Sequence, residues 1–171
     1  MTLQAKLYTL LSAGSLRNAG NEEEIIRLVR IQKDFDELIK FLFHSERKVV
    51  MHAADVVEKI SSHHPEYLQQ HKRDLINLLR TAVHKELKWH LAQLIGRLKL
   101  SAVDVKACWT ILEKWAMDQQ ESRIVRVFAI QTLYDLCETW VSYKPAFQRL
   151  IDKVSIEDIP SIRSRIRKLK L

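Results

Sequence analysis

The 171-residue sequence contains only three glycines and three prolines, so it has few residues suited to tight hairpin turns. With 47% apolar and 29% charged residues, it is neither a disordered nor a collagen-like chain. Apolar residues recur at intervals of three and four along almost the whole chain. Pro65, Pro145 and Pro160 stand where helices could begin, because a fixed φ and a missing amide cost nothing in a first turn. The sequence therefore predicts an all-α fold.

Cysteines and long apolar runs are also scarce. Cys108 and Cys137 form neither a disulfide framework nor a CxxC motif, which is typical of a reducing compartment. No apolar run approaches the roughly 18 residues that span a bilayer. The segment Leu7–Ala13 is interrupted by Thr9 and Ser12, which makes it a poor signal peptide. We expect a soluble cytoplasmic protein that does not bind membranes.

Signature motifs of catalysis, nucleotide binding and metal binding are missing as well. The sequence contains no GxSxG, P-loop, dinucleotide-binding or HExxH motif. All seven histidines lie between His44 and His90, where His52 and His90 occupy equivalent places on neighbouring helices. Helix axes pack about 8–10 Å apart, whereas a shared zinc needs each nitrogen within about 2.1 Å. We expect no catalytic residue, no metal, no cofactor and no small-molecule substrate.

What the sequence does contain is a repeat of about 38 residues. Apolar residues recur in four helices at successive shifts of 38, 38 and 37 positions. The four sets are Val49, Ala53, Val57 and Ile60; Leu87, Leu91, Ile95 and Leu98; Val125, Ala129, Leu133 and Leu136; and Ile162, Ile166 and Leu169. The helices before them repeat in the same way, with Leu38, Leu75, Leu112 and Leu150 at corresponding places. Two agreeing registers predict a stack of helical pairs, each an A helix followed by a B helix.

The repeat divides the chain into an N-terminal cap and about four units of one domain. The cap covers residues 1–33 and contains helical stretches around Leu3–Leu11 and Glu22–Ile31 that fit the period poorly. Terminal units of repeat proteins are usually atypical, because one face must meet water. The four units span about residues 34–62, 63–100, 101–140 and 141–171.

Two helix starts are marked by residues with the spacing of a capping box. Asp34 precedes Glu37 by three positions, and Ser101 precedes Asp104 by three positions. In this motif the first side chain caps the helix and the second one reaches back to the first backbone amide. We expect helices to begin directly after Asp34 and after Ser101.

The start of the third B helix carries a recognisable pattern. Val125 is followed by Arg126, and the small residue Ala129 comes one turn later. In this pattern and in the length of its units, the chain resembles the HEAT repeat family over about residues 34–171. The resemblance implies a right-handed alpha–alpha superhelix of about four helical pairs that serves as a scaffold or adaptor for a protein or peptide partner.

The resemblance also implies a row of charge pairs between repeats, which this sequence carries only in part. Glu121 and Asp158 supply the acidic residue that the family has four positions before the aliphatic one. Arg126 stands at the basic position, but Val50 and Lys88 replace arginine in the first two units. We expect a partial row of such pairs.

In the HEAT family the B helices line the concave surface, so the B-helix positions opposite the core would meet a partner. At 100° per residue these candidate binding residues are Met51, Asp55, Glu58, Trp89, Gln93, Val127, Gln131 and Tyr134. We predict that Trp89 and Tyr134 act as apolar anchors, while Asp55 and Glu58 select a basic end of the partner. A drift of one position would instead place Trp89 in the packing between units.

The net charge of +7 favours a second hypothesis, nucleic-acid binding. The excess lies in residues 47–98 and 145–171, each of which sums to +4. The second patch contains the possible phosphate-binding residues Arg163, Arg165, Arg167, Lys168 and Lys170. Cations also suit a helix C-terminus and a solvated outer face, so this patch has a purely structural interpretation too.

An enzymatic version of that hypothesis comes from the DNA alkylation repair glycosylases, which are also HEAT-like. Their concave face combines aromatic residues with a carboxylate. Trp89 resembles the aromatic residue, but Gln93 stands one turn later, where the carboxylate is expected. A glutamine would not stabilise positive charge developing on a sugar, so we expect a binding protein and no enzyme.

Overall fold

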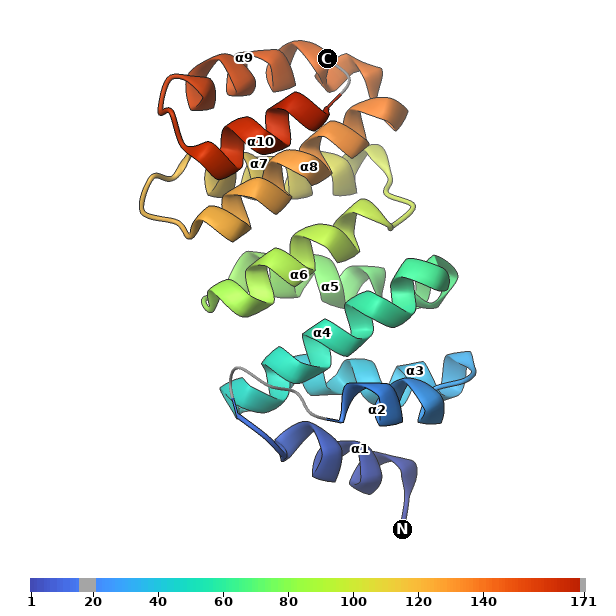
Figure 1. Cartoon of the computed structure of the whole chain (residues 1–171). Coiled ribbons are helices and arrows are strands. Elements are labelled where there is room, and N and C mark those ends of the chain that lie inside the picture. Colours follow the sequence, from blue (N-terminus) through green and yellow to red (C-terminus); the bar gives the residue numbers. More distant parts are fainter. Residues whose placement is uncertain (16–20, 170–171) are drawn as a thin grey trace. The chain divides into compact units, whose positions relative to one another are not determined.

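The structure, a computed structural model, describes residues 1–15 and 21–169. The chain forms two compact units, Met1–His71 and Lys72–Leu171. Both are built of helices, and the described residues contain no β-strand (Figure 1). The all-α prediction is confirmed.

The unit Met1–His71 contains one long helical hairpin with two further helices packed on it. Its elements are α1 (Leu3–Ser12), α2 (Glu22–Leu28), α3 (Gln32–Ile39), η1 (Lys40–Phe43), α4 (Arg47–His63) and η2 (Pro65–His71). Helices α3 and α4 form the hairpin, α1 packs against both, and α2 packs against α4 (Figure 1). The two helical stretches predicted before residue 34 are therefore present as α1 and α2.

Polar contacts attach α1 and α2 to α4. The buried His52 places Nδ1 2.7 Å from the carbonyl oxygen of Leu11 and Nε2 3.0 Å from that of Ser15. Lys59 forms an ion pair with Glu22 of α2 and another with Asp55, one turn earlier in α4. Burial lowers the pKa of Lys59, but its hydrogen bonds to the two carboxylates outweigh that effect and raise it.

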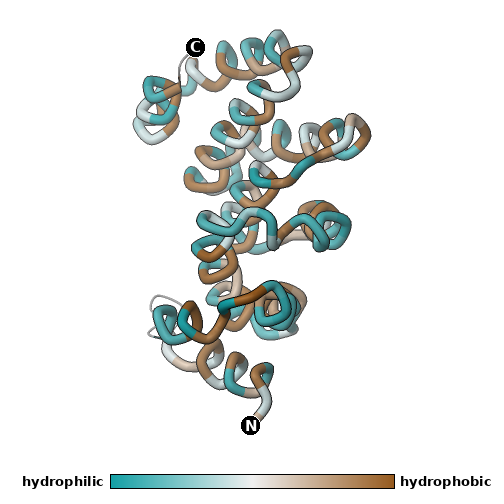
Figure 2. The backbone as a smooth tube through the Cα atoms, turned by 90° about the vertical axis from the view of Figure 1, so that its right-hand side faces the viewer, coloured by the Kyte–Doolittle hydropathy of each residue, from teal (hydrophilic) through white to brown (hydrophobic). Residues whose placement is uncertain are grey.

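The unit Lys72–Leu171 contains three successive helical hairpins. They are α5 (Lys72–Thr81) with α6 (Lys85–Gly96), α7 (Ala102–Met117) with α8 (Arg123–Thr139), and, after η3 (Val141–Tyr143), α9 (Lys144–Ser155) with α10 (Pro160–Lys168). Helices α5, α7 and α9 pack in sequence to form an A layer, and α6, α8 and α10 form a B layer (Figure 1). Hydrophobic and hydrophilic residues alternate along each helix, as amphipathic helices require (Figure 2).

The core residues follow the sequence repeat closely. Leu91 and Ala129 are completely buried. The other repeat positions of α4, α6 and α8 are completely or almost completely buried. Trp109 and Trp115 of α7 are buried as well. Only Ile166 of α10 is left half-buried. The register of the repeat is confirmed in α4, α6 and α8, and in α10 at Ile162.

Most of the predicted helix starts are confirmed. Ser101 caps α7, with its hydroxyl accepting from the Asp104 amide at 3.2 Å while the Asp104 carboxylate accepts from the Ser101 amide. All three prolines lie in the first turn of a helical segment. Asp34 was misplaced: α3 begins at Gln32, three residues earlier than predicted, and the Asp34 carboxylate accepts from the amide of Arg30 at 3.0 Å. The carboxylate therefore caps the helix from inside its first turn.

In the unit Lys72–Leu171, α6 and α8 each carry a basic side chain that pairs with an acidic residue of the following repeat. Arg126 is 1% exposed, and its guanidinium donates to both carboxylate oxygens of Glu157 at 2.7 and 2.8 Å. Its Nε donates to the carbonyl of Ala116 at 2.9 Å. Lys88 takes the same role with Glu121. Asp158, which stands at the family's acidic position, pairs instead with the exposed Arg163.

The confirmed register predicts the effect of a charge in the core. We expect Leu91→Asp to lower the free energy of unfolding by about 4 kcal/mol or more, because an unpaired carboxylate would be buried between α6 and its neighbours. Gln93→Asp, two residues along the same helix and half-exposed, should change it by less than about 1 kcal/mol. Thermal melts followed by circular dichroism measure both, and a wild-type melt for Leu91→Asp would contradict the register.

The Arg126 pair predicts a second difference in stability. Arg126→Met would leave the Glu157 carboxylate and the Ala116 carbonyl without their donor, so we expect a loss of about 3–5 kcal/mol. The exposed pair of Arg163 with Asp158 provides the control, and Arg163→Met should cost at most about 1 kcal/mol. Urea titration gives both values. Equal losses for the two variants would show that burial of the pair does not matter.

Candidate partner-binding surface

A row of partly exposed side chains crosses the B layer of the unit Lys72–Leu171. The ring of Trp89 on α6 stacks on that of Phe128 on α8, with centroids 5.4 Å apart and planes 30° apart. The guanidinium of Arg165 on α10 lies over the Phe128 ring, 5.7 Å from its centroid. All three side chains are half-buried. We call Trp89, Phe128 and Arg165 the aromatic row.

Hydrogen bonds hold the end of this row in place. Arg165 donates through Nη1 to the side-chain oxygen of Gln131 at 2.9 Å, and Gln131 donates to the Asp135 carboxylate at 2.8 Å. Burial raises the pKa of Asp135, an effect that the Gln131 hydrogen bond and the Arg165 charge reduce. This chain of contacts joins α8 to α10 and fixes the side chains before any partner arrives.

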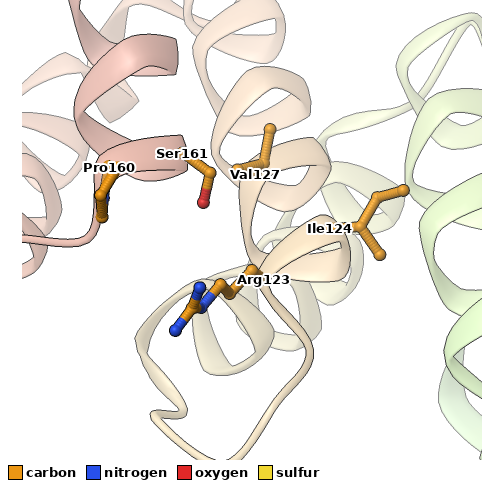
Figure 3. A pocket seen from close by; sticks show the side chains of 5 residues that line it. All are labelled: Arg123, Ile124, Val127, Pro160 and Ser161. Atoms are coloured by element: carbon orange, nitrogen blue, oxygen red, sulfur yellow. The ribbon is translucent and has the colours of Figure 1, made fainter.

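A groove opens beside the row, between the first turns of α8 and α10 (Figure 3). Its volume is about 430 Å³, and it is lined by Arg123, Ile124, Val127, Pro160 and Ser161. Ile124 is 42% exposed. A smaller cavity of about 150 Å³ lies between α6 and α8, with Gln93 and Gln131 in its wall. The B layer therefore offers both projecting rings and a hollow.

Four predicted binding residues lie in this region. Trp89, Gln93, Val127 and Gln131 are all half-buried, with Val127 in the groove and Gln93 and Gln131 at the smaller cavity. Tyr134 lies to one side, where its ring is 5.9 Å from that of Phe147 on α9. Their role in binding stays a prediction.

The other three predicted residues belong to the unit Met1–His71. Met51, Asp55 and Glu58 lie half-buried on α4, the helix against which α2 packs. The Asp55 carboxylate is 2.9 Å from the ammonium of Lys59. An acid that already has a cationic neighbour offers less charge to a basic partner, so Asp55 is a weaker selector than its sequence position indicates.

Sequence reasoning missed Phe128 as a surface residue. Trp89 was matched with Val127 by the 38-residue shift, but its stacking partner lies 39 positions away. A search for aromatic or arginine residues near equivalent positions would have found Phe128 beside Val127.

The comparison with protein families matches residues 13–170 to the HEAT repeat domain. The chain belongs to the HEAT repeat family. Searches of curated proteins and of solved structures gave no match. HEAT repeats commonly act as scaffolds for protein interactions, and they are generally non-catalytic. The more distant relation to DNA alkylation repair glycosylases stays a prediction.

Both cysteines of this HEAT array are buried. Burial raises the pKa of Cys108 to about 12 and that of Cys137 to about 11, so neither thiol forms a nucleophilic thiolate near neutral pH. No cluster of three or more potential metal ligands occurs in residues 1–15 and 21–169. None of the helices described is both long and apolar enough to cross a bilayer.

The basic residues of α10 divide into two pairs. Arg163 forms an ion pair with Asp158, and Arg165 belongs to the aromatic row. Arg167 and Lys168 are exposed and have no hydrogen-bonding or ionic partner in the described part of the chain. Lys170, the last of the predicted phosphate-binding residues, lies outside the described residues.

Proposed function

We propose that this HEAT protein is a non-catalytic module that binds a protein partner through the B layer of Lys72–Leu171. The observation that carries the proposal is the aromatic row. Tryptophan, aromatic residues and arginine dominate the energetics of protein interfaces, particularly when neighbouring side chains already exclude water from them. Trp89, Phe128 and Arg165 bring these residue types together on three successive helices.

The state of these side chains before binding supports the same proposal. An interface side chain that must be immobilised costs about 0.5–1.5 kcal/mol of binding free energy. Here Arg165 is already held by Phe128 and Gln131, and Trp89 by its stacking on Phe128. A partner would therefore meet a largely ordered surface and lose less affinity to side-chain ordering.

Nucleic-acid binding is the second candidate, favoured by the absence of acidic residues within α10. The structure gives it less support than the charge count does. Two of the four described cations in this helix already contact other side chains, which leaves Arg167 and Lys168 for phosphates. Two phosphate contacts release few counterions and give weak binding at physiological salt.

The proposed function is tested by removing the two rings of the row. We expect the double variant Trp89→Ala, Phe128→Ala to keep its helical circular dichroism, because both rings are partly exposed. The amount of each protein that it captures should fall at least about tenfold relative to the wild type. The assay is affinity capture from cells that make the protein, with quantitative mass spectrometry. A photo-cross-linker at Gln93 identifies which captured proteins touch the B layer.

Trp140→Ala is the matched control, since it removes a half-buried indole at the end of α8, away from the row. It should retain the wild-type set of proteins. Capture that survives loss of both rings, or no cross-link from Gln93, would refute the proposed surface.

A further inference from the structure

The groove between α8 and α10 has an aliphatic floor. Ile124 and Val127 come from α8 and Pro160 from α10, and none of the five lining residues is aromatic. Figure 3 shows Arg123 extending along the α10 side of the groove, whereas Ile124 points away from α10. A volume of about 430 Å³ falls within the range of about 300–1,000 Å³ that is typical of ligand pockets. The floor can therefore take up an apolar side chain.

The groove has a cation at one end. Arg123 stands there, and its side chain makes no hydrogen bond or ion pair within the described residues. Lys168 is exposed on the face of α10 that continues from Ser161, two turns further along the helix. One free arginine thus lines the groove, and a second exposed cation lies beyond the lining residues.

No acidic side chain lines the groove to balance these cations. The nearest acids along the chain already have partners: Glu121 is held by Lys88, Glu157 by Arg126 and Asp158 by Arg163. On α8 the first carboxylate beyond Gln131 on this face is Asp135, which accepts a hydrogen bond from Gln131. The charge of the groove is therefore unbalanced and selects for an anionic occupant.

We propose that this groove binds a short acidic segment of a protein partner. One aliphatic or aromatic side chain of the segment fills the space between Val127 and Pro160 and contacts Ile124 at the edge of the groove. A carboxylate beside that side chain meets Arg123, and a second one further along the segment meets Lys168. The inference rests on the proposed function, since it names the chemistry of a partner that the B layer recognises.

An apolar floor distinguishes this occupant from a nucleic acid. A phosphate backbone across Ile124 and Val127 would cover apolar surface with groups that gain nothing from it. Single-stranded binding sites stack bases on aromatic rings, and the groove lining has none. The two rings of the aromatic row already stack on each other. A peptide supplies both the apolar side chain and the negative charge from one short segment.

The test is selection of binders from a random-peptide display library on the purified full chain. We expect enriched peptides to carry Leu, Ile or Phe flanked by Asp or Glu. The affinity of a synthetic enriched peptide, measured by fluorescence anisotropy, should fall at least about tenfold in Arg123→Glu and in Ile124→Ser, and should weaken as salt is raised. Both residues lie on the surface, so both variants should fold.

Lys106→Glu is the matched control, because it makes the same change of charge on an exposed site of α7, in the A layer. It should alter peptide affinity by less than about twofold. The inference is overturned if no peptide is enriched, if enriched peptides lack acidic residues, or if their binding ignores Arg123→Glu and Ile124→Ser. It is equally overturned if Arg123→Glu abolishes binding of a short duplex DNA while acidic peptides do not bind.

These outcomes separate the groove from the aromatic row. If the double variant Trp89→Ala, Phe128→Ala loses its protein partners but acidic peptides do not need Arg123, the groove proposal fails and the proposed function stands. If acidic peptides need Arg123 but protein capture survives loss of both rings, the groove proposal stands and the aromatic row is not the docking surface.

Discussion

No helical hairpin of this chain can bury its apolar stripe alone, and this constraint determines the rest of the structure. In the unit Lys72–Leu171 each B helix covers the next one, so Leu91 and Ala129 lose all contact with water. The buried Thr132 hydroxyl donates to the Ala92 carbonyl at 2.8 Å and fixes α8 against α6. Repeat proteins are stabilised in this way by interfaces between neighbours as well as by the repeats themselves.

The same packing creates the surface. Because equivalent helices lie in one layer, side chains at nearly equivalent positions meet across their boundaries, and Trp89, Phe128 and Arg165 form a row without any dedicated loop. The charge pairs strengthen the arrangement, since the buried guanidinium of Arg126 binds both the Glu157 carboxylate at the turn before α10 and the Ala116 carbonyl at the end of α7. That turn leads directly into the residues that line the groove. Stability and recognition thus depend on the same contacts between repeats.

The repeat made the core predictable from the sequence, because burial recurs with the period and errors at single residues average out. Contacts that depend on one residue's exact place were harder to predict. Phe128 was missed because it lies one residue beyond the repeat equivalent of Trp89. A helical wheel does not show that side chains lean along the helix, so it did not place the two rings together. The family pattern singles out Asp158, but the neighbouring Glu157 is the carboxylate that reaches Arg126, and only the geometry shows this. The groove could not be foreseen, since it depends on the spacing between α8 and α10.

Mutual stabilisation of neighbouring hairpins is most directly tested by hydrogen–deuterium exchange on the variant Leu133→Ala. Leu133 is completely buried in α8, and its truncation should destabilise the core by about 2–5 kcal/mol. If the repeats depend on one another, amides in α6 and α10 should exchange faster together with those of α8. Faster exchange confined to α8, with α6 and α10 as protected as in the wild type, would contradict the account.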